Sequence, residues 1–276
     1  MINRDVVVTS RQNPSIKRLC SLLEKKGREA SGLFRFDGIK LFSEAASCGV
    51  EIEEIYLRES SISTIEARLE SEMSSMPACK VICVSDDVFE KISEEKAPEG
   101  IITVAKYIDG LSKVTVINDI DIPKKSESVL LLESLRDPGN LGTVLRSAAA
   151  LGIDKVILSS DCADVYNPKT IRASMGAIFR VPICRLGEGL MPEYIERLRG
   201  SGRRVFAAAL NSDAEVLGSF DMQAGDCFVI GNEGHGLSEK VIDACDKCVI
   251  IPMQAGCESL NAAAASVILM WEMKKL

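Results

Sequence analysis

The chain has 276 residues, 46% of them hydrophobic and 26% charged, with a formal net charge of −7. This composition excludes a disordered chain, and the length fits two domains of ordinary size, each with its own core. No run approaches the roughly 18 apolar residues of a membrane span and no apolar leader opens the sequence, which predicts a cytoplasmic protein that does not enter membranes.

The first hundred residues alternate helical and strand-like stretches. A helix that opens at Pro14 places Ile16, Leu19, Leu22 and Leu23 on one face. The sequence also predicts helices over 40–48 and 63–71 and strands over 54–57, 80–84 and 101–105. These elements predict a small α/β domain over residues 1–107. Residues 108–127 contain polar and turn-forming residues and are predicted to be a linker.

From residue 128 onwards the pattern is a regular βα repetition. Strands are predicted over 129–132, 155–158, 204–208, 227–230 and 248–251, and helices over 141–150, 169–173, 192–199, 238–244 and 260–273. The strands are almost continuously apolar, which is typical of strands buried on both faces of a parallel sheet. We predict a second α/β domain over residues 128–276, with a mostly parallel sheet and helices on both faces.

The ten cysteines are scattered and several lie in apolar stretches, so reduced core thiols are expected in the cytoplasm. Cys245 and Cys248 have zinc-knuckle spacing, but a structural zinc site needs four convergent ligands and His235 is the only histidine. No metal is predicted. Residues 1–40 hold nine basic and four acidic side chains, so positive charge is concentrated there. Such a patch suits contact with phosphates, although a solvated helix face explains any single cation equally well.

Three strings in the second domain place Gly, Asn, Glu and Ser against strand-like stretches. They are ESLRDPGNLGTVLRSAAALG from Glu133, FVIGNEGHGLS from Phe228 and IPMQAGCESLNAAAAS from Ile251. Open α/β sheets build ligand sites at the carboxyl ends of their strands, so a site is expected here. The spacing of the glycines in the second string differs from the dinucleotide fingerprint, which argues against a nicotinamide cofactor. Taken alone, that string would be an ordinary glycine turn before a helix.

Together the strings resemble the three motifs of the SpoU/TrmH-type RNA 2′-O-ribose methyltransferases of the SPOUT superfamily. The first motif, Asn-x-Gly-x-x-x-Arg, is matched by Asn140, Gly142 and Arg146. The second, Gly-Asn-Glu-Gly-x-Gly, is matched by residues 231–236, and the third by residues 251–253 and 259–262. Residues 10–14 and 36–38 resemble the small substrate-binding domain that often precedes this fold, with Asp37 where the family usually has Glu.

The resemblance implies the fold and the activity. It implies an L30e-like α/β domain followed by a SPOUT domain whose C-terminal segment forms a deep trefoil knot. It implies an S-adenosylmethionine-dependent methyltransferase that acts on a ribose 2′-hydroxyl in structured RNA, ribosomal or transfer, as a homodimer joined through the knotted domain. Two alternatives stay open: a non-catalytic RNA-binding factor that keeps the fold, and an enzyme that modifies a base. The intact motif residues argue against the first, and the first motif argues against the second.

The resemblance also assigns residues. Arg146 is the general base in accounts of the family; because a guanidinium seldom gives up its proton, it is alternatively an electrostatic group that grips a phosphate and stabilises the alkoxide. Capping is the plain alternative for the Asn and Ser residues. The predicted catalytic set is Arg146, Asn140, Glu233, Ser259 and Asn261. The predicted cofactor set is Ile230, Gly231, Asn232, Gly234, Ile251, Met253 and Leu260. The predicted RNA-binding set is Arg11, Lys17, Arg18, Lys25, Lys26, Arg28 and Arg35.

Overall fold

The chain forms two compact units. The computed structural model describes residues 6–75, 77, 79–108, 111–114, 121–211, 213–254, 256 and 259–275. The first unit consists of Met1–Ile108 with Asp164–Phe179, and the second of Asp109–Ala163 with Arg180–Leu276. Within the described ranges, none of the helices is long and apolar enough to cross a membrane.

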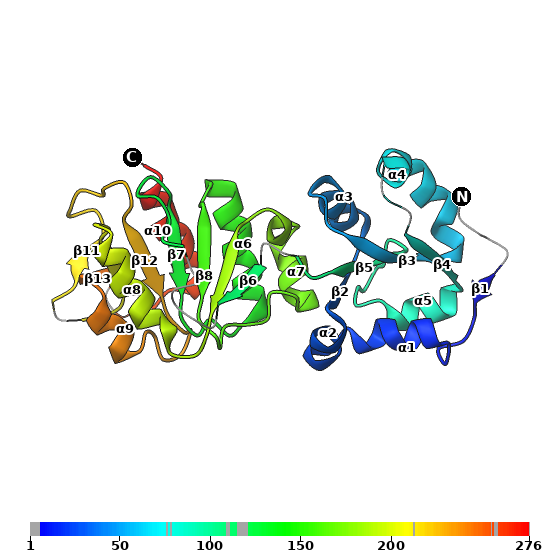
Figure 1. Cartoon of the computed structure of the whole chain (residues 1–276), viewed down its shortest axis with the longest axis horizontal. Helices are drawn as coiled ribbons and strands as arrows, with labels where there is room; N and C mark the ends of the chain where they lie inside the picture. The colour runs from blue at the N-terminus through cyan, green and yellow to red at the C-terminus, as the bar shows by residue number, and fades with distance from the viewer. Residues whose placement is uncertain are drawn as a thin grey trace. The chain divides into compact units, whose positions relative to one another are not determined.

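The first unit is a five-stranded sheet between two layers of helices (Figure 1). Its strands, in the order β1-β4-β3-β5-β2, are β1 (Val7–Val8), β4 (Lys80–Val84), β3 (Ile52–Arg58), β5 (Ile101–Lys106) and β2 (Leu33–Asp37). Strand β5 is antiparallel to both of its neighbours, and the other pairs are parallel. The core on one face comes from α1 (Pro14–Ser21) and α5 (Asp86–Ile92), and that on the other from α3 (Ile39–Ser47) and α4 (Ile62–Ser75). The unit also contains α2 (Lys25–Ser31), α7 (Pro168–Ser174) and two short 3-10 helices, Glu59–Ser61 and Ala177–Phe179.

The elements of the first unit that were not predicted include α2 and β2. The helix α2 reads KKGREAS and has no apolar stripe. The strand β2 contains Arg35 and Asp37, yet all five of its residues are buried. Arg35 Nη2 donates to Asp37 Oδ1 at 2.8 Å, so the two buried charges neutralise each other inside the sheet. Burial here depends on the pair and not on either residue alone.

The stretch Asp164–Phe179 belongs to the first unit, although in sequence it follows a strand of the second unit, β8 (Lys155–Leu158). The ring of Tyr166 stacks on Tyr107 with centroids 4.0 Å apart and planes 6° apart, and it lies 4.8 Å from the ring of Phe34. Phe179 lies 5.4 Å from Phe36. Such aromatic packing buries large apolar areas. The boundaries predicted from sequence therefore differ from the compact units at this stretch.

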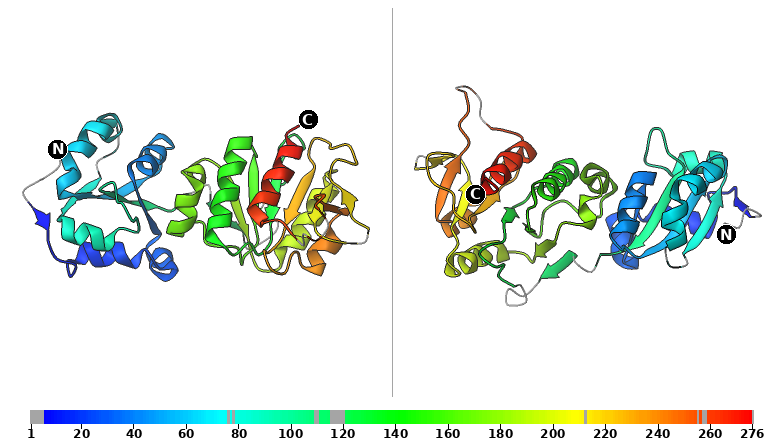
Figure 2. Two further views of the ribbon diagram at one scale, coloured as in Figure 1. Left: turned by 180° about the vertical axis from the view of Figure 1, so that it is seen from behind. Right: turned by 90° about the horizontal axis from the view of Figure 1, so that it is seen from above.

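The second unit is built on an eight-stranded sheet in the order β11-β13-β10-β12-β7-β8-β9-β6, and each described pairing is parallel. The strands are β6 (Leu111–Val114), β7 (Val129–Leu132), β8 (Lys155–Leu158), β9 (Ile183–Leu186), β10 (Val205–Ala208), β11 (Glu215–Val216), β12 (Cys227–Ile230) and β13 (Lys247–Ile250). Helices α6 (Pro138–Leu151) and α10 (Ala262–Met273) lie side by side on one face (Figure 2). Helices α8 (Leu190–Gly200) and α9 (Glu239–Ala244) pack on the other, over a core from β7, β10 and β12.

The predicted linker, residues 108–127, contains the strand β6, which pairs in parallel with β9. Residues 109–110 and 115–120 of that linker lie outside the described residues. The strand β9 was not predicted, and its four residues include Arg185. The Arg185 guanidinium donates to the carbonyl oxygens of Ser160, Cys162 and Ala163, which satisfies the charge next to the sheet.

The starts of helices α6 and α10 differ from the predictions for a reason that the structure shows. Helix α6 begins at Pro138, because the Asp137 carboxylate accepts from the backbone N–H of Asn140 at 2.8 Å and caps the helix. Helix α10 begins at Ala262, one residue after its cap, Asn261, so Leu260 precedes the helix. In both cases the side chain that satisfies the free N–H groups sets the start.

Candidate functional site

The loops that follow three adjacent strands meet at one edge of the second sheet. Strand β7 lies between β12 and β8, and parallel strands present their carboxyl ends together. The Glu133 N–H donates to the carbonyl of Ile230 at 2.8 Å, and the Ser159 N–H donates to that of Leu132 at 3.0 Å. These bonds bring the loops 133–137, 159–163 and 231–237 next to one another.

A chain of hydrogen bonds joins the three predicted motifs. Asn140 Nδ2 donates to Glu233 Oε1 at 3.0 Å, and Asn140 Oδ1 accepts from Asn261 Nδ2 at 3.1 Å. Asn261 Oδ1 in turn accepts from the first N–H groups of α10. Glu233 also accepts from the backbone N–H groups of Asp137 and Arg136, at 3.3 and 3.4 Å. Three of the five predicted catalytic residues thus lie in direct contact.

Glu233 is a fixed negative charge in this chain. Partial burial disfavours its ionised form, but the hydrogen bonds from Asn140 and from the backbone at 136 and 137 outweigh it and lower the pKa of the carboxyl. A carboxylate that accepts several hydrogen bonds and stays ionised at neutral pH is suited to holding donors in place and unsuited to supplying a proton.

The second-motif loop is closed on itself. The backbones of Asn232 and Gly236 exchange two 3.0 Å hydrogen bonds, and Asn232 Oδ1 accepts from the N–H groups of Gly234 and His235. A Cβ on Gly231 would lie 2.3 Å from the backbone carbon of Gly236, which excludes any other residue there. Of the three glycines in this loop, Gly231, Gly234 and Gly236, only Gly236 adopts a positive φ, at +69°. Position 231 therefore requires glycine, because the backbones at the two ends of the loop lie too close together for a side chain.

The other predicted donor-binding residues lie at the end of β12, after β13 and before α10. Ile230 is buried at the end of β12, while Ile251 and Met253 are half-buried just after β13. Leu260 keeps 40% of its surface exposed before α10. Apolar side chains beside a polar loop are the surroundings that a nucleoside needs. The residue types present therefore fit S-adenosylmethionine.

Two predicted catalytic residues do not join the chain of hydrogen bonds. Arg146 lies six residues after Asn140 on α6, which at 3.6 residues per turn puts it on a different face. It is exposed, and the described part of the chain offers it no hydrogen-bond or ion-pair partner. Ser259 is also exposed and, within the described ranges, makes no side-chain hydrogen bond. It does not cap α10, since Asn261 does.

The predicted RNA-binding set divides into three groups. Arg28 and Arg35 are each 1% exposed and bound to Asp164 and Asp37, so the prediction that they contact RNA is corrected: both are internal charges of the first unit. Arg18 pairs with Glu54, and Lys25 pairs with Glu29 across the surface. Arg11, Lys17 and Lys26 are exposed and have no ion-pair partner among the described residues.

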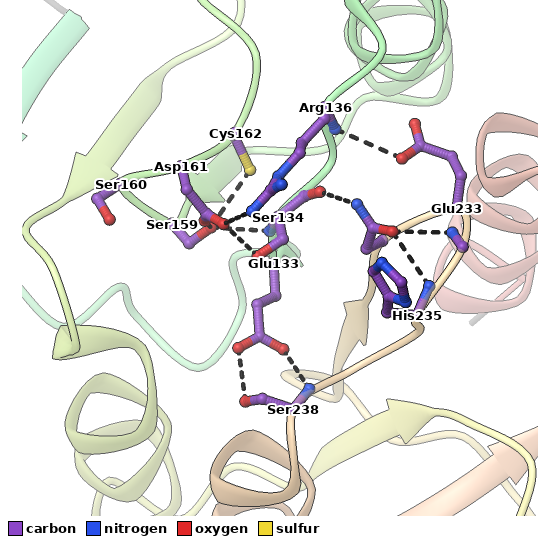
Figure 3. A network of polar contacts seen from close by, with 12 residues as sticks. Glu133, Ser134, Arg136, Ser159, Ser160, Asp161, Cys162, Glu233, His235 and Ser238 are labelled. Carbon is purple, nitrogen blue, oxygen red and sulfur yellow. Dashed lines mark hydrogen bonds and ion pairs between the residues drawn. The ribbon is translucent and has the colours of Figure 1, made fainter.

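Sequence reasoning missed a group of polar residues in the same loops (Figure 3). Both oxygens of Glu133 accept from Ser238, one from its hydroxyl at 2.7 Å and one from its N–H at 2.9 Å. Asp161 accepts from Ser134, Ser159 and Arg136. The available signal was position, because Glu133 and Ser159 directly follow predicted strands.

Comparison with known proteins decides the family. The sequence model of the SpoU rRNA Methylase family matches residues 127–271, and that of the MRM3-like substrate binding domain matches residues 13–103. The chain belongs to the SpoU rRNA methylase family. The first match covers most of the second unit and the three motifs, and the second covers most of the first unit.

Several relatives match over most of the chain. The 23S rRNA (guanosine(2553)-2'-O)-methyltransferase RlmP of Bacillus subtilis is 28% identical over 97% of this chain and 98% of its own length. The 23S rRNA (uridine(2479)-2'-O)-methyltransferase of Streptomyces viridochromogenes is 32% identical over 69% of this chain and 66% of its own. The AdoMet-bound rRNA methyltransferase from Sinorhizobium meliloti superposes with a TM-score of 0.82 at 27% identity, over 99% and 98% of the two chains.

These findings confirm the predicted family, the SPOUT-type fold with a small N-terminal α/β domain, the activity as an RNA 2′-O-ribose methyltransferase, and S-adenosylmethionine as cofactor. RNA is confirmed as the substrate class.

Proposed function

We propose that this enzyme methylates a ribose 2′-hydroxyl of ribosomal RNA in the cytoplasm, at the edge formed by β7, β12 and α10. The hydrogen-bond chain Glu233–Asn140–Asn261 carries the proposal, because it unites all three motifs at one site. Two relatives are named for 23S rRNA, one for a guanosine and one for a uridine. A guanosine and a uridine share the ribose and its phosphate but differ in the base. The site therefore needs groups that bind a ribose and a phosphate rather than groups that recognise one base.

The donor lies against the second-motif loop in this proposal. S-adenosylmethionine supplies an electrophilic methyl group on a sulfonium. Ile251, Met253 and Leu260 provide apolar surface for its adenine, and the backbone of Gly231 to Gly234 provides polar edges. Glu233 clamps the first-motif loop onto the second through three hydrogen bonds, which fixes the geometry before substrate arrives.

Arg146 is the group that engages the RNA. Its side chain is exposed and has no partner among the described residues, so a substrate phosphate can bind it without breaking an existing ion pair. A guanidinium near the attacking ribose oxygen stabilises the negative charge that develops as the hydroxyl loses its proton. Asn140 and Asn261 orient the neighbouring loops, with their amides held in fixed directions by Glu233 and by the N-terminus of α10. Ser259 lies beside Asn261 in this proposal and contacts ligand.

Exposed apolar side chains support a homodimer. Val267 and Trp271 lie one turn apart on α10 and are 37% and 55% exposed, and Leu260 before the helix is 40% exposed. An exposed apolar surface on a helix of the knotted-type domain is suited to a second copy of the chain. A Trp271→Glu variant should therefore run as a smaller particle in sedimentation than the wild type; an unchanged particle would contradict this interface.

A trefoil knot is supported by the position of α10. This helix follows β13, which lies near one edge of the sheet, yet it packs against α6 and β12 in the interior of the strand order. Threading of the connection between β13 and α10 through a neighbouring loop would form the knot that the family resemblance implies.

The direct test uses ribosomal RNA from cells that lack the gene. Purified enzyme and S-adenosylmethionine should add one methyl group per target site, mapped by mass spectrometry of nuclease fragments. A synthetic fragment with a 2′-deoxy nucleotide at the mapped site should accept none. Methyl transfer to that deoxy fragment would locate the product on a base and overturn the proposal.

A further inference from the structure

Ser134 has an unusual backbone conformation in the first-motif loop. Its φ is +55°, in the left-handed region, where a residue with a side chain is strained. It directly follows Glu133 at the end of β7. Strain of this kind persists only where the surrounding structure holds it, and it concentrates at functional sites.

Each polar group of Ser134 is bound. Its N–H donates to Ser159 Oγ at 2.8 Å, and its hydroxyl donates to Asp161 Oδ2 at 2.6 Å. Ser159 Oγ itself donates to Asp161 Oδ1 at 2.6 Å. The carboxylate of Asp161 therefore holds Ser134 twice, once directly and once through Ser159 (Figure 3).

The carbonyl of Ser134 faces the second-motif loop. It accepts from Asn232 Nδ2 at 2.8 Å. The other end of that amide, Asn232 Oδ1, holds the N–H groups of Gly234 and His235. Within the described residues, the Ser134 carbonyl is the only hydrogen-bond acceptor for Asn232 Nδ2. A rotation of the Ser134 backbone would move this carbonyl away, and the second-motif loop would lose its hydrogen bond to the first-motif loop.

Asp161 is ionised in this arrangement. Partial burial raises its pKa, but hydrogen bonds from Ser134, Ser159 and Arg136 outweigh burial and hold the pKa below its ordinary value. Arg136 is largely exposed and lies 3.2 Å away, so its ion pair adds little. The two short serine hydrogen bonds are the substantial contacts.

We infer that Asp161 is a positioning residue: it locks Ser134 in the left-handed conformation that anchors Asn232 and so shapes the donor-binding loop. The inference rests on the donor site proposed above. Asp161 touches neither donor nor RNA in this account, and it acts from the loop after β8, outside the three motifs.

The test asks whether a glycine at position 134 removes the need for Asp161. The quantity measured is the Kd of S-adenosylmethionine, by calorimetry on the full-length protein. Asp161→Asn should weaken donor binding about tenfold, or about 1.4 kcal/mol, because the uncharged amide cannot accept both serine hydroxyls as strongly. Ser134→Gly should bind nearly as well as wild type, since glycine adopts positive φ without support. In the Ser134→Gly background, Asp161→Asn should then weaken binding less than twofold. Glu188→Gln is the control, an exposed carboxylate in the loop after β9.

The outcomes separate the possible failures. A tenfold loss in both backgrounds, or no loss in either, would overturn the positioning role. A lower unfolding temperature with an unchanged Kd would also overturn it and make Asp161 a purely structural residue. A wild type that fails to bind S-adenosylmethionine would instead refute the donor site itself.

Discussion

The buried ion pair between Arg28 and Asp164 should stabilise the first unit strongly. The Arg28 guanidinium is 2% exposed and donates to Asp164 Oδ2 from Nη2 at 2.6 Å and from Nε at 3.2 Å. Its remaining N–H groups donate to the carbonyls of Leu22 and Leu23. Asp164→Ala removes the compensating charge and leaves the cation buried, which typically costs about 3–5 kcal/mol.

The lower end of that range applies, because Asp164 is 19% exposed and the two carbonyl contacts survive. A cost of about 3 kcal/mol corresponds to a fall of roughly 12 °C in the Tm of a unit of this size, at about 4 °C per kcal/mol. Three of the four tyrosines, Tyr56, Tyr107 and Tyr166, lie in this unit, so near-UV circular dichroism of the tyrosines reports mainly on it. The fluorescence of Trp271 reports the second unit separately.

The matched control is an exposed pair in the same unit. Lys25 and Glu29 lie 3.7 Å apart with their side chains 64% and 60% exposed. Glu29→Ala should therefore cost less than about 0.5 kcal/mol. An Arg28→Met, Asp164→Ala double variant should regain part of the loss, since no charge is then left buried. If Asp164→Ala cost no more than Glu29→Ala, the argument from burial would be refuted.

Three further predictions concern the site and the units. Arg146→Ala should abolish methyl transfer while leaving the donor Kd and Tm near wild type, because the side chain is exposed; retained transfer would remove it from the catalytic set. The hydrogen bonds that Glu233 accepts should persist at pH values above 4.5, the ordinary pKa of a glutamate, and weaken only as the pH falls through the lower pKa of Glu233 in the folded protein. The Kd of S-adenosylmethionine, measured between pH 3 and 7, should therefore rise only at the acidic end, and a Kd that rises already near pH 6 would contradict this. Deletion of residues 1–107 should make the remainder aggregate, because the apolar side chains of 164–179 lose their cover; a monodisperse product in size-exclusion chromatography would contradict this.

Local patterns predicted the elements whose own residues are sufficient to specify them, without a partner elsewhere in the chain. The apolar runs of β7, β8 and β12 are buried throughout or nearly so, and these strands lie where their runs predicted. Helix α6 was predicted to begin at residue 141, directly after Asn140, but it begins at Pro138. Asp137 followed by Pro138 is a cap and a first helical position, and it takes precedence over Asn140.

Charge was the least predictable property. Arg28 and Arg35 look like surface cations in the sequence, and both are buried. Their burial depends on partners: Asp37 is two residues from Arg35, but Asp164 is 136 residues from Arg28. A cation is stable inside a protein only when a carboxylate and further acceptors meet it there, and no local pattern specifies such a meeting.

The sequence by itself determined the family, the chemistry and the residues of the three motifs, because those depend on residue types at short spacings. The tertiary structure alone decided which of them touch. Glu233 and Asn140 are 93 residues apart, and Asn140 and Asn261 are 121 apart. They meet because β12 pairs with β7 and α10 packs against α6. Arg146, within the first motif, stays outside this chain because a helix turns it to another face.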